Sequence, residues 1–114
     1  KFFFEFGLGS IVCADVGEGL NEYRVAATGG SAVTVRGGQV YIGGGLLDES
    51  AYAVPFAEDI DAEFTVPEYS LLLLPDDRSG VSASELEGHI IPSRSVFGKV
   101  RLRVYPFERL NIFG

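Results

Sequence analysis

The sequence predicts an all-β domain with little helix, and two observations support that prediction. Of the 114 residues, fifteen are Gly and five are Pro, which is typical of a chain with many turns. Val, Phe and Tyr occur in short runs between these turn residues, and 46% of the chain is apolar. No apolar run approaches the ~18 residues that a membrane-spanning helix needs. We therefore expect one domain, residues 1–114, large enough to bury a core.

The first half of the chain contains the clearest strand signals. Residues 10–14 and 22–28 are strand-like and flank a Gly-rich turn at 17–19. Two alternating runs, 32–36 and 39–42, are joined by Gly37-Gly38. Both glycines can adopt the positive φ that a tight hairpin turn requires, so this segment predicts a β-hairpin. The glycines that follow, 43–45, end the strand; they make a poor phosphate loop, because neither a Lys-Ser/Thr pair nor a helix follows.

The second half is less regular until residue 63. Residues 46–62 are acidic, but Glu58, Asp59 and Asp61 lack the spacing of a calcium loop, so we expect a solvated loop there. Residues 63–66 and 70–74 are predicted strands. Leu71-Leu72-Leu73-Leu74 has the length of a strand that is buried on both faces.

Polar and small residues at 75–88 predict a loop, with at most a short turn at Ser93–Val96. Residues 99–105 alternate between polar and apolar side chains and predict a half-buried strand that Pro106 ends.

Charge limits the partners that the chain can bind. The net charge of −7 argues against nucleic acid and against an anionic membrane surface. Five of the nine basic side chains fall in residues 94–109, whereas residues 1–93 hold fifteen of the sixteen acidic ones. Either the basic terminal strand packs against acidic neighbours, or it forms a docking strip for an acidic partner.

Two single residues carry little chemistry by themselves. Cys13 has no second cysteine to pair with, and its apolar strand context predicts a buried, inert thiol. His89 is the one histidine, so no metal-ligand cluster can be assembled around it, and we expect no metal or other cofactor.

Residues 66–100 are similar to the last motif block of the type I signal peptidases, membrane-bound serine proteases with a Ser/Lys dyad. That family reads VPEG, an apolar strand, GDNRDNSSDSR, a Gly, an Ile-Pro step and IVGKV. The matching positions here are Val66-Pro67-Glu68, Asp76-x-Arg78, Gly88, Ile91-Pro92 and Gly98-Lys99-Val100. Further ordered matches are Gly9–Val12, Tyr23–Val33, Gly38–Gly44, Leu47–Ser50 and Tyr105–Leu110. The resemblance covers residues 9–110 and implies the signal-peptidase β-fold of antiparallel sheets.

The resemblance also implies that the catalytic site is vacated. The family's base is the Lys directly before Arg, and here Tyr23 precedes Arg24. A neutral phenol with an ordinary pKa near ~10 cannot replace a neutral amine as base. The Ser that bonds that Lys aligns with Val81, and the Asp and Arg that pair around the site align with Ala83 and Glu85. We therefore assign no catalytic residues and regard these four positions as vacated.

Other elements of the family's chemistry are missing as well. The nucleophile motif SMxPT does not occur in this sequence. Ser10 does not replace it, because it falls where the family has the Asp of GDIVV. The family's Pro-Gly-Asp aligns with Gly29-Gly30-Ser31.

These observations lead to an expected function and two alternatives. The first expectation is a non-catalytic signal-peptidase-like protein, similar to the inactive members that assist pilus assembly, with extended peptide or pilin- and sortase-type proteins as partners. The second is a signal peptidase whose nucleophile lies outside this chain and whose base is not Tyr23. The third is an unrelated β-barrel module.

The first two expectations imply the extracytoplasmic face of the membrane, with an anchor outside this chain. Phe2, Phe3, Phe4 and Phe6, like Phe107, Ile112 and Phe113, would then either pack in the core or touch the membrane surface.

Overall fold

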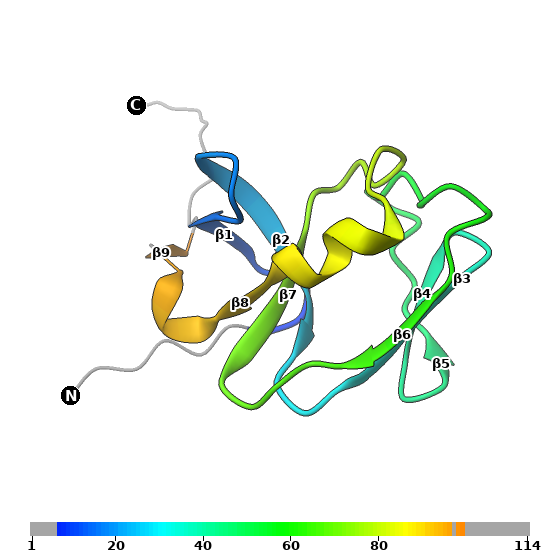
Figure 1. Ribbon diagram of the computed structural model, residues 1–114, viewed down its shortest axis with the longest axis horizontal. Coiled ribbons are helices and arrows are strands. Elements are labelled where there is room, and N and C mark those ends of the chain that lie inside the picture. The colour runs from blue at the N-terminus through cyan, green and yellow to red at the C-terminus, as the bar shows by residue number, and fades with distance from the viewer. Residues whose placement is uncertain (1–6, 97, 100–114) are drawn as a thin grey trace.

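The computed structural model describes residues 7–96 and 98–99, and it consists of two antiparallel sheets joined by loops (Figure 1). The larger sheet has the strand order β8-β7-β2-β1-β9. Its strands are β1 (Ile11–Asp15), β2 (Leu20–Thr28), β7 (Ser70–Leu74), β8 (Ile90–Pro92) and β9 (Gly98–Lys99). The all-β fold class that the sequence predicts is confirmed.

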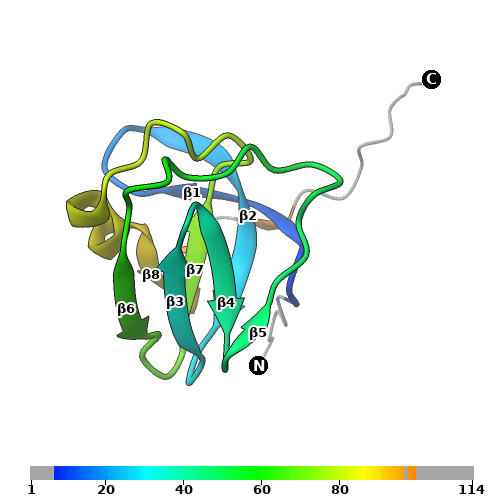
Figure 2. The same ribbon diagram turned by 90° about the vertical axis from the view of Figure 1, so that its right-hand side faces the viewer.

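The smaller sheet has the order β5-β4-β3-β6 and faces the viewer in Figure 2, with β7, β2 and β1 behind it. Its strands are β3 (Ala32–Arg36), β4 (Gln39–Ile42), β5 (Gly45–Leu46) and β6 (Ala62–Thr65). The predicted hairpin is the β3–β4 pair, in which Arg36 faces Gln39. Gly37 and Gly38 have φ values of 58° and 83°, as this turn requires.

The core is divided by the larger sheet into two apolar clusters. One cluster, between the sheets, includes Ala26, Val33, Leu72 and Leu74. The other, on the far face, includes Val12, Val25, Leu71 and Leu73. The four leucines of β7 therefore alternate between the clusters, and the prediction of burial on both faces is confirmed.

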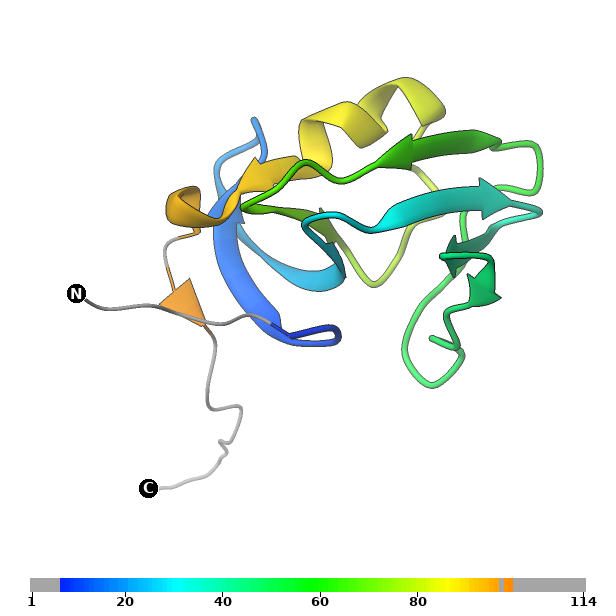
Figure 3. The ribbon, with the colours of Figure 1, turned by 90° about the horizontal axis from the view of Figure 1, so that it is seen from below.

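One prediction is wrong: residues 75–88 are not all loop. A 3₁₀ helix, η1 (Ala83–His89), lies beside β8, as Figures 1 and 3 show. The motif Ser82-x-x-Glu85 begins it, because the Glu85 carboxylate accepts a hydrogen bond from the Ser82 N–H at 2.8 Å. This start signal is present in the sequence, where the polar composition concealed it. A second short 3₁₀ turn, η2 (Ser93–Ser95), confirms the turn expected at 93–96.

The predicted strand at 99–105 is described only at its first residue, where Lys99 pairs with Val12. The rest of that strand, the aromatic residues at both ends of the chain and the basic residues beyond Lys99 lie outside the described residues. In the part of the chain that is described, no helix is long and apolar enough to cross a membrane.

Cys13 is partly exposed rather than buried, because Val12 and Ala14 occupy the inward positions of β1. Glu58, Asp59 and Asp61 are exposed, as expected of a solvated loop. Among the described residues, no group of His, Cys, Asp and Glu side chains is arranged to hold a metal ion.

Candidate functional site

Two consecutive residues of β2, Tyr23 and Arg24, define two neighbouring regions with different chemistry. Arg24 donates two hydrogen bonds to Asp76, from Nε at 2.8 Å and from Nη2 at 3.0 Å. Its Nη1 donates to the Gly9 carbonyl at 2.9 Å. Its guanidinium also lies 3.8 Å from the centre of the Tyr52 ring, within cation–π range. Arg24 thus joins β2 to three segments that are distant in the sequence.

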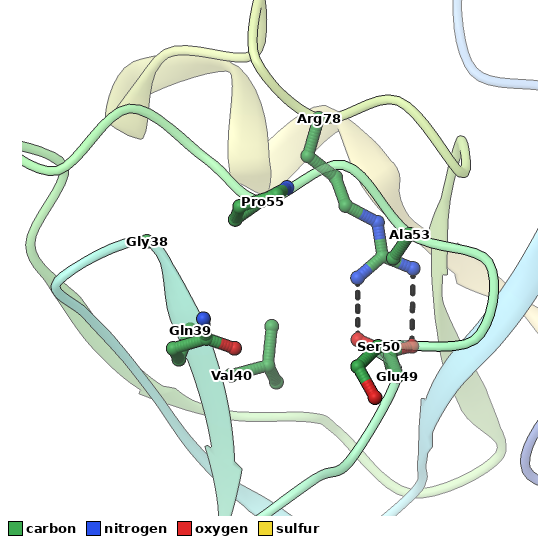
Figure 4. A pocket seen from close by; sticks show the side chains of 8 residues that line it. All are labelled: Gly38, Gln39, Val40, Glu49, Ser50, Ala53, Pro55 and Arg78. Carbon is green, nitrogen blue, oxygen red and sulfur yellow. Dashed lines mark hydrogen bonds and ion pairs between the residues drawn. The ribbon is translucent and has the colours of Figure 1, made fainter.

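A second arginine, Arg78, extends this set of contacts into the interior. Its Nη1 and Nη2 donate to the two carboxylate oxygens of Glu49, at 2.5 and 3.1 Å, and both side chains are buried (Figure 4). Its Nε donates to the Pro75 carbonyl at 2.6 Å. The Tyr52 hydroxyl donates to Glu49 at 3.2 Å and so links the two arginines. We call Arg24, Glu49, Tyr52, Asp76 and Arg78 the ion-pair frame.

The ion-pair frame fixes the loop that follows β7. Arg78 and Glu49 form part of the wall of a small cavity of about 250 Å³ between the β3–β4 turn and residues 49–55 (Figure 4). A bidentate Arg–carboxylate pair has a defined geometry, and a buried one is costly to break. The Asp76-x-Arg78 motif therefore positions residues 75–78 against β2.

A larger cavity of about 440 Å³ has Pro75 in its wall. Three of the four positions predicted to be vacated, Tyr23, Val81 and Glu85, line it together. The fourth, Ala83, is exposed in the first turn of η1 and does not line it. The remaining lining residues are Glu18, Asn21, Glu22, Pro75, Asp77, Gly80 and His89. We call this space the site cavity.

Tyr23 contributes a buried phenol to the site cavity. Its side chain is 6% exposed, and this burial raises the pKa of its hydroxyl. Asn21 opposes the rise in pKa, while the negative charges of Glu18 and Asp15 add to it. The phenol is therefore neutral at physiological pH. No Lys or Arg side chain among the described residues lines the cavity, so nothing there offers the amine of a Ser/Lys dyad.

Glu85, which the resemblance aligns with an arginine, has a structural role in this chain. The hydrogen bonds from Ser82 lower the pKa of the Glu85 carboxyl, with a smaller contribution from His89. An ionised carboxylate in the first turn stabilises the start of a helix. The start of η1 therefore explains why a negatively charged side chain is favourable at this position.

His89 also lines the site cavity, and no local sequence pattern predicts this position. Its ring meets Tyr23 edge to face, with 5.9 Å between ring centroids and an interplanar angle of 83°. Its Nδ1 lies 2.8 Å from the Leu73 carbonyl oxygen. The strand register explains this position: Ile90 pairs with Leu72, so His89 comes opposite Leu73, and Leu73 pairs with Val25 of β2.

The site cavity lies beside the end of a strand ladder. β2 pairs with β1 from Leu20 to Arg24, but its pairing with β7 begins only at Arg24, opposite Leu74. Pro75 ends β7 there. The segment Leu20–Tyr23 thus runs on past the end of β7, and Asn21, Glu22 and Tyr23 line the cavity.

The other sequence candidates lie outside the site cavity. The Ser10 carbonyl accepts a hydrogen bond from the Val25 N–H at 2.8 Å, which is a scaffold contact. A Cβ on Gly29 would lie 2.9 Å from the Pro67 carbonyl oxygen, so this glycine permits close backbone approach. Neither residue lines the site cavity.

Comparisons with known proteins agree with this geometry. The chain is 30% identical over 89 residues to a probable signal peptidase I-2 of Synechocystis sp., covering 78% of this chain and 40% of that protein. It is 33% identical over 91 residues to a signal peptidase I of Leptolyngbya laminosa, covering 80% of this chain and 44% of that protein. The chain thus spans less than half the length of these curated relatives, and no family model matches it.

A solved structure shows the same fold. The crystal structure of a signal peptidase I from Enterococcus faecalis matches with a TM-score of 0.65 at 20% identity, covering 86% of this chain and 98% of that one. The ordered motifs, the sheet arrangement and these relatives lead to one assignment. The chain belongs to the signal peptidase I family.

Proposed function

We propose that this domain binds extended peptide without Ser/Lys chemistry. The observation that carries the proposal is Tyr23, which lines the site cavity as a neutral phenol and which the resemblance aligns with the family's lysine. Val81 lines the same cavity and has no hydroxyl with which to orient an amine. By this alignment a phenol and a valine replace the dyad's base and its serine partner, while the ion-pair frame beside them holds its hydrogen bonds.

The proposed binding mode is strand addition along Leu20–Tyr23. The N–H of Val25 donates to Ser10, so it points toward β1. Backbone groups alternate in direction along an antiparallel strand, so the N–H of Leu20 points to the opposite side, beyond the end of β7. An extended peptide placed there adds main-chain hydrogen bonds, and its side chains reach the site cavity.

A role in assembling surface proteins is the proposed biological context. The domain would hold an extended segment of a pilin- or sortase-type partner at the extracytoplasmic face of the membrane, anchored by a part of the protein outside this chain. The phenol of Tyr23 in the site cavity of a signal peptidase I family member supports this role. The net charge of −7 disfavours nucleic acid as the partner.

An array of fluorescent, proline-free octapeptides, followed by titration of the best binder, tests the binding mode. Leu20→Pro removes the outward N–H and is expected to weaken binding by about tenfold, the worth of roughly one hydrogen bond. Leu46→Pro is the matched control, because Leu46, like Leu20, is an exposed leucine in a strand. Leu46 lies in the edge strand β5 of the other sheet. The N–H of Leu46 points away from the neighbouring strand β4, because the N–H of the next residue, Leu47, donates to the Val40 carbonyl in β4. Equal binding by wild type and Leu20→Pro would contradict the proposed mode.

A second candidate function is a peptidase whose nucleophile lies outside this chain. It is favoured by His89, an imidazole in the same cavity as Tyr23 and a suitable general base. Covalent capture of the full-length protein by an acylating signal peptidase inhibitor would support this candidate over the first.

A further inference from the structure

His89 presents an acceptor of defined direction to the site cavity. A carbonyl oxygen only accepts hydrogen bonds, so the 2.8 Å contact with Leu73 requires a proton on Nδ1. The neutral imidazole then carries its lone pair on Nε2. No other side chain or backbone group among the described residues forms a hydrogen bond with Nε2. The backbone of β7 thus sets which ring nitrogen is the acceptor.

The surroundings of His89 hold the ring in place. The ring packs edge-on against Tyr23, which is itself buried. The residue lies at the end of η1 and directly before β8, so both ends of its backbone belong to ordered elements. An acceptor that is oriented before a ligand arrives gives up little conformational entropy on binding.

We propose that His89 selects the occupant of the site cavity by accepting a hydrogen bond at Nε2 from an N–H or O–H donor at the end of an aliphatic side chain. This inference rests on the proposed peptide binding and adds a preferred residue class to it, namely lysine or a hydroxyl-bearing residue. Of these, we expect the ammonium group to bind more tightly, because the cavity wall also holds the carboxylates of Glu18, Asp77 and Glu85.

The volume of the site cavity is suited to such an occupant. About 440 Å³ admits a four-carbon chain with its terminal group, and Val81 and the Tyr23 ring provide apolar wall for the methylenes. A side chain that enters from a peptide on Leu20–Tyr23 would place its end group near η1. The donor group and the aliphatic stem thus each meet a matching surface.

The test uses two probes of equal charge. n-Butylammonium carries N–H donors, whereas tetramethylammonium carries none, and 1-butanol provides a neutral O–H donor. Each is titrated into ¹⁵N-labelled protein, and the signals of His89, Tyr23 and Val81 are followed. Because the chain has a single histidine, the imidazole nitrogen signals need no further assignment. In the free protein we expect the tautomer with the proton on Nδ1.

We expect n-butylammonium to bind at least about tenfold more tightly than tetramethylammonium, with the largest ¹⁵N shift at Nε2. His89→Asn should reduce this preference, because asparagine can still donate to Leu73 but offers no acceptor at the Nε2 position; the preference that remains comes from the carboxylates of the cavity wall. His89→Phe, which keeps a ring against Tyr23, should do the same. Tyr69→Phe, at an exposed turn, is the control and should retain the preference.

Equal binding of the two cations, an unchanged preference in His89→Asn, or a tautomer with the proton on Nε2 would each overturn the inference. None of these results bears on strand addition, which Leu20→Pro tests separately. Loss of peptide binding in both Leu20→Pro and Leu46→Pro would instead count against the proposed function.

Discussion

Tyr23 and Arg24 are adjacent in β2, yet the regions around them differ in what they retain of the family. Around Arg24, each charged group of the ion-pair frame has a partner of opposite charge, and the pairs connect segments up to 52 residues apart. Around Tyr23, the side chains that the resemblance aligns with the family's catalytic positions are a phenol, a valine and a helix-starting glutamate. If the proposed loss of the dyad is right, the scaffold is retained beside a site that has lost its chemistry, even at consecutive positions.

The buried pair at the centre of the ion-pair frame should give the largest effect on stability. Arg78→Met leaves Glu49 buried without its partner, and we expect the free energy of unfolding to fall by about 3–5 kcal/mol. The double variant Arg78→Met with Glu49→Leu should recover most of this loss, because no uncompensated charge remains. Urea unfolding of the wild type, the single variant and the double variant measures these changes in the free energy of unfolding. A loss below about 1 kcal/mol in the single variant would show that the frame is dispensable.

The outer pair should give a smaller, pH-dependent effect. The hydrogen bonds from Arg24 lower the pKa of Asp76 in the folded state. A lowered folded pKa stabilises the fold above the ordinary carboxyl pKa of about 3.9, and this stabilisation is lost as pH falls through the folded value. Asp76 is 42% exposed, so solvent screening limits the effect to about 1 kcal/mol.

Unfolding of Asp76→Asn measured between pH 7 and pH 2 should lack this acid-dependent loss. Asp61→Asn is the matched control, because Asp61 lies 3.9 Å from Arg36 in a pair that is 71% and 75% exposed. The control should follow the wild type at every pH. An equal change in both variants would mean that the Arg24 pair contributes no more than an ordinary surface contact.

The smallest expected effect concerns a position where the scaffold itself departs from the family. The family's VPEG places glycine where this chain has Tyr69, whose φ is +62° and whose side chain is 84% exposed. Tyr69→Gly should stabilise the fold by about 0.5 kcal/mol. Glycine relieves the strain of a positive φ, and the greater conformational freedom of the unfolded chain offsets part of that gain. Tyr69→Ala keeps the Cβ and should show no gain. A destabilised Tyr69→Gly variant would contradict this prediction and would indicate that a contact of the exposed Tyr69 ring stabilises the fold.

Local signals in the sequence predicted the parts of the fold that depend on neighbouring residues. The Gly37-Gly38 turn sets the β3–β4 hairpin, and the run of four leucines predicts a strand buried on both faces. The start of η1 was also local, but its Ser82-x-x-Glu85 signal lies within a polar stretch that resembles a loop. The polar composition of this stretch predicts a loop, whereas the structure has a 3₁₀ helix there.

Contacts across long separations could not be predicted from residue patterns alone. Glu49 and Arg78 are 29 residues apart, and nothing in either local context indicates that they pair. His89 looked isolated in the sequence because its position depends on the register of three strands. The resemblance did predict that three distant residues lie close together, because proteins of one family share one fold. These residues are Tyr23, Val81 and Glu85, which line the same cavity. Ala83 was the exception, because η1 turns it toward solvent.

The most direct test of the central claim is the intact mass of the full-length protein after incubation with an acylating, β-lactam-like or lipopeptide signal peptidase inhibitor. If the frame is retained and the dyad lost, the mass stays unchanged, and it stays unchanged in Tyr23→Lys because Val81, Ala83 and Glu85 remain. A mass increase of one acyl group in the wild-type protein would contradict the account and establish a peptidase.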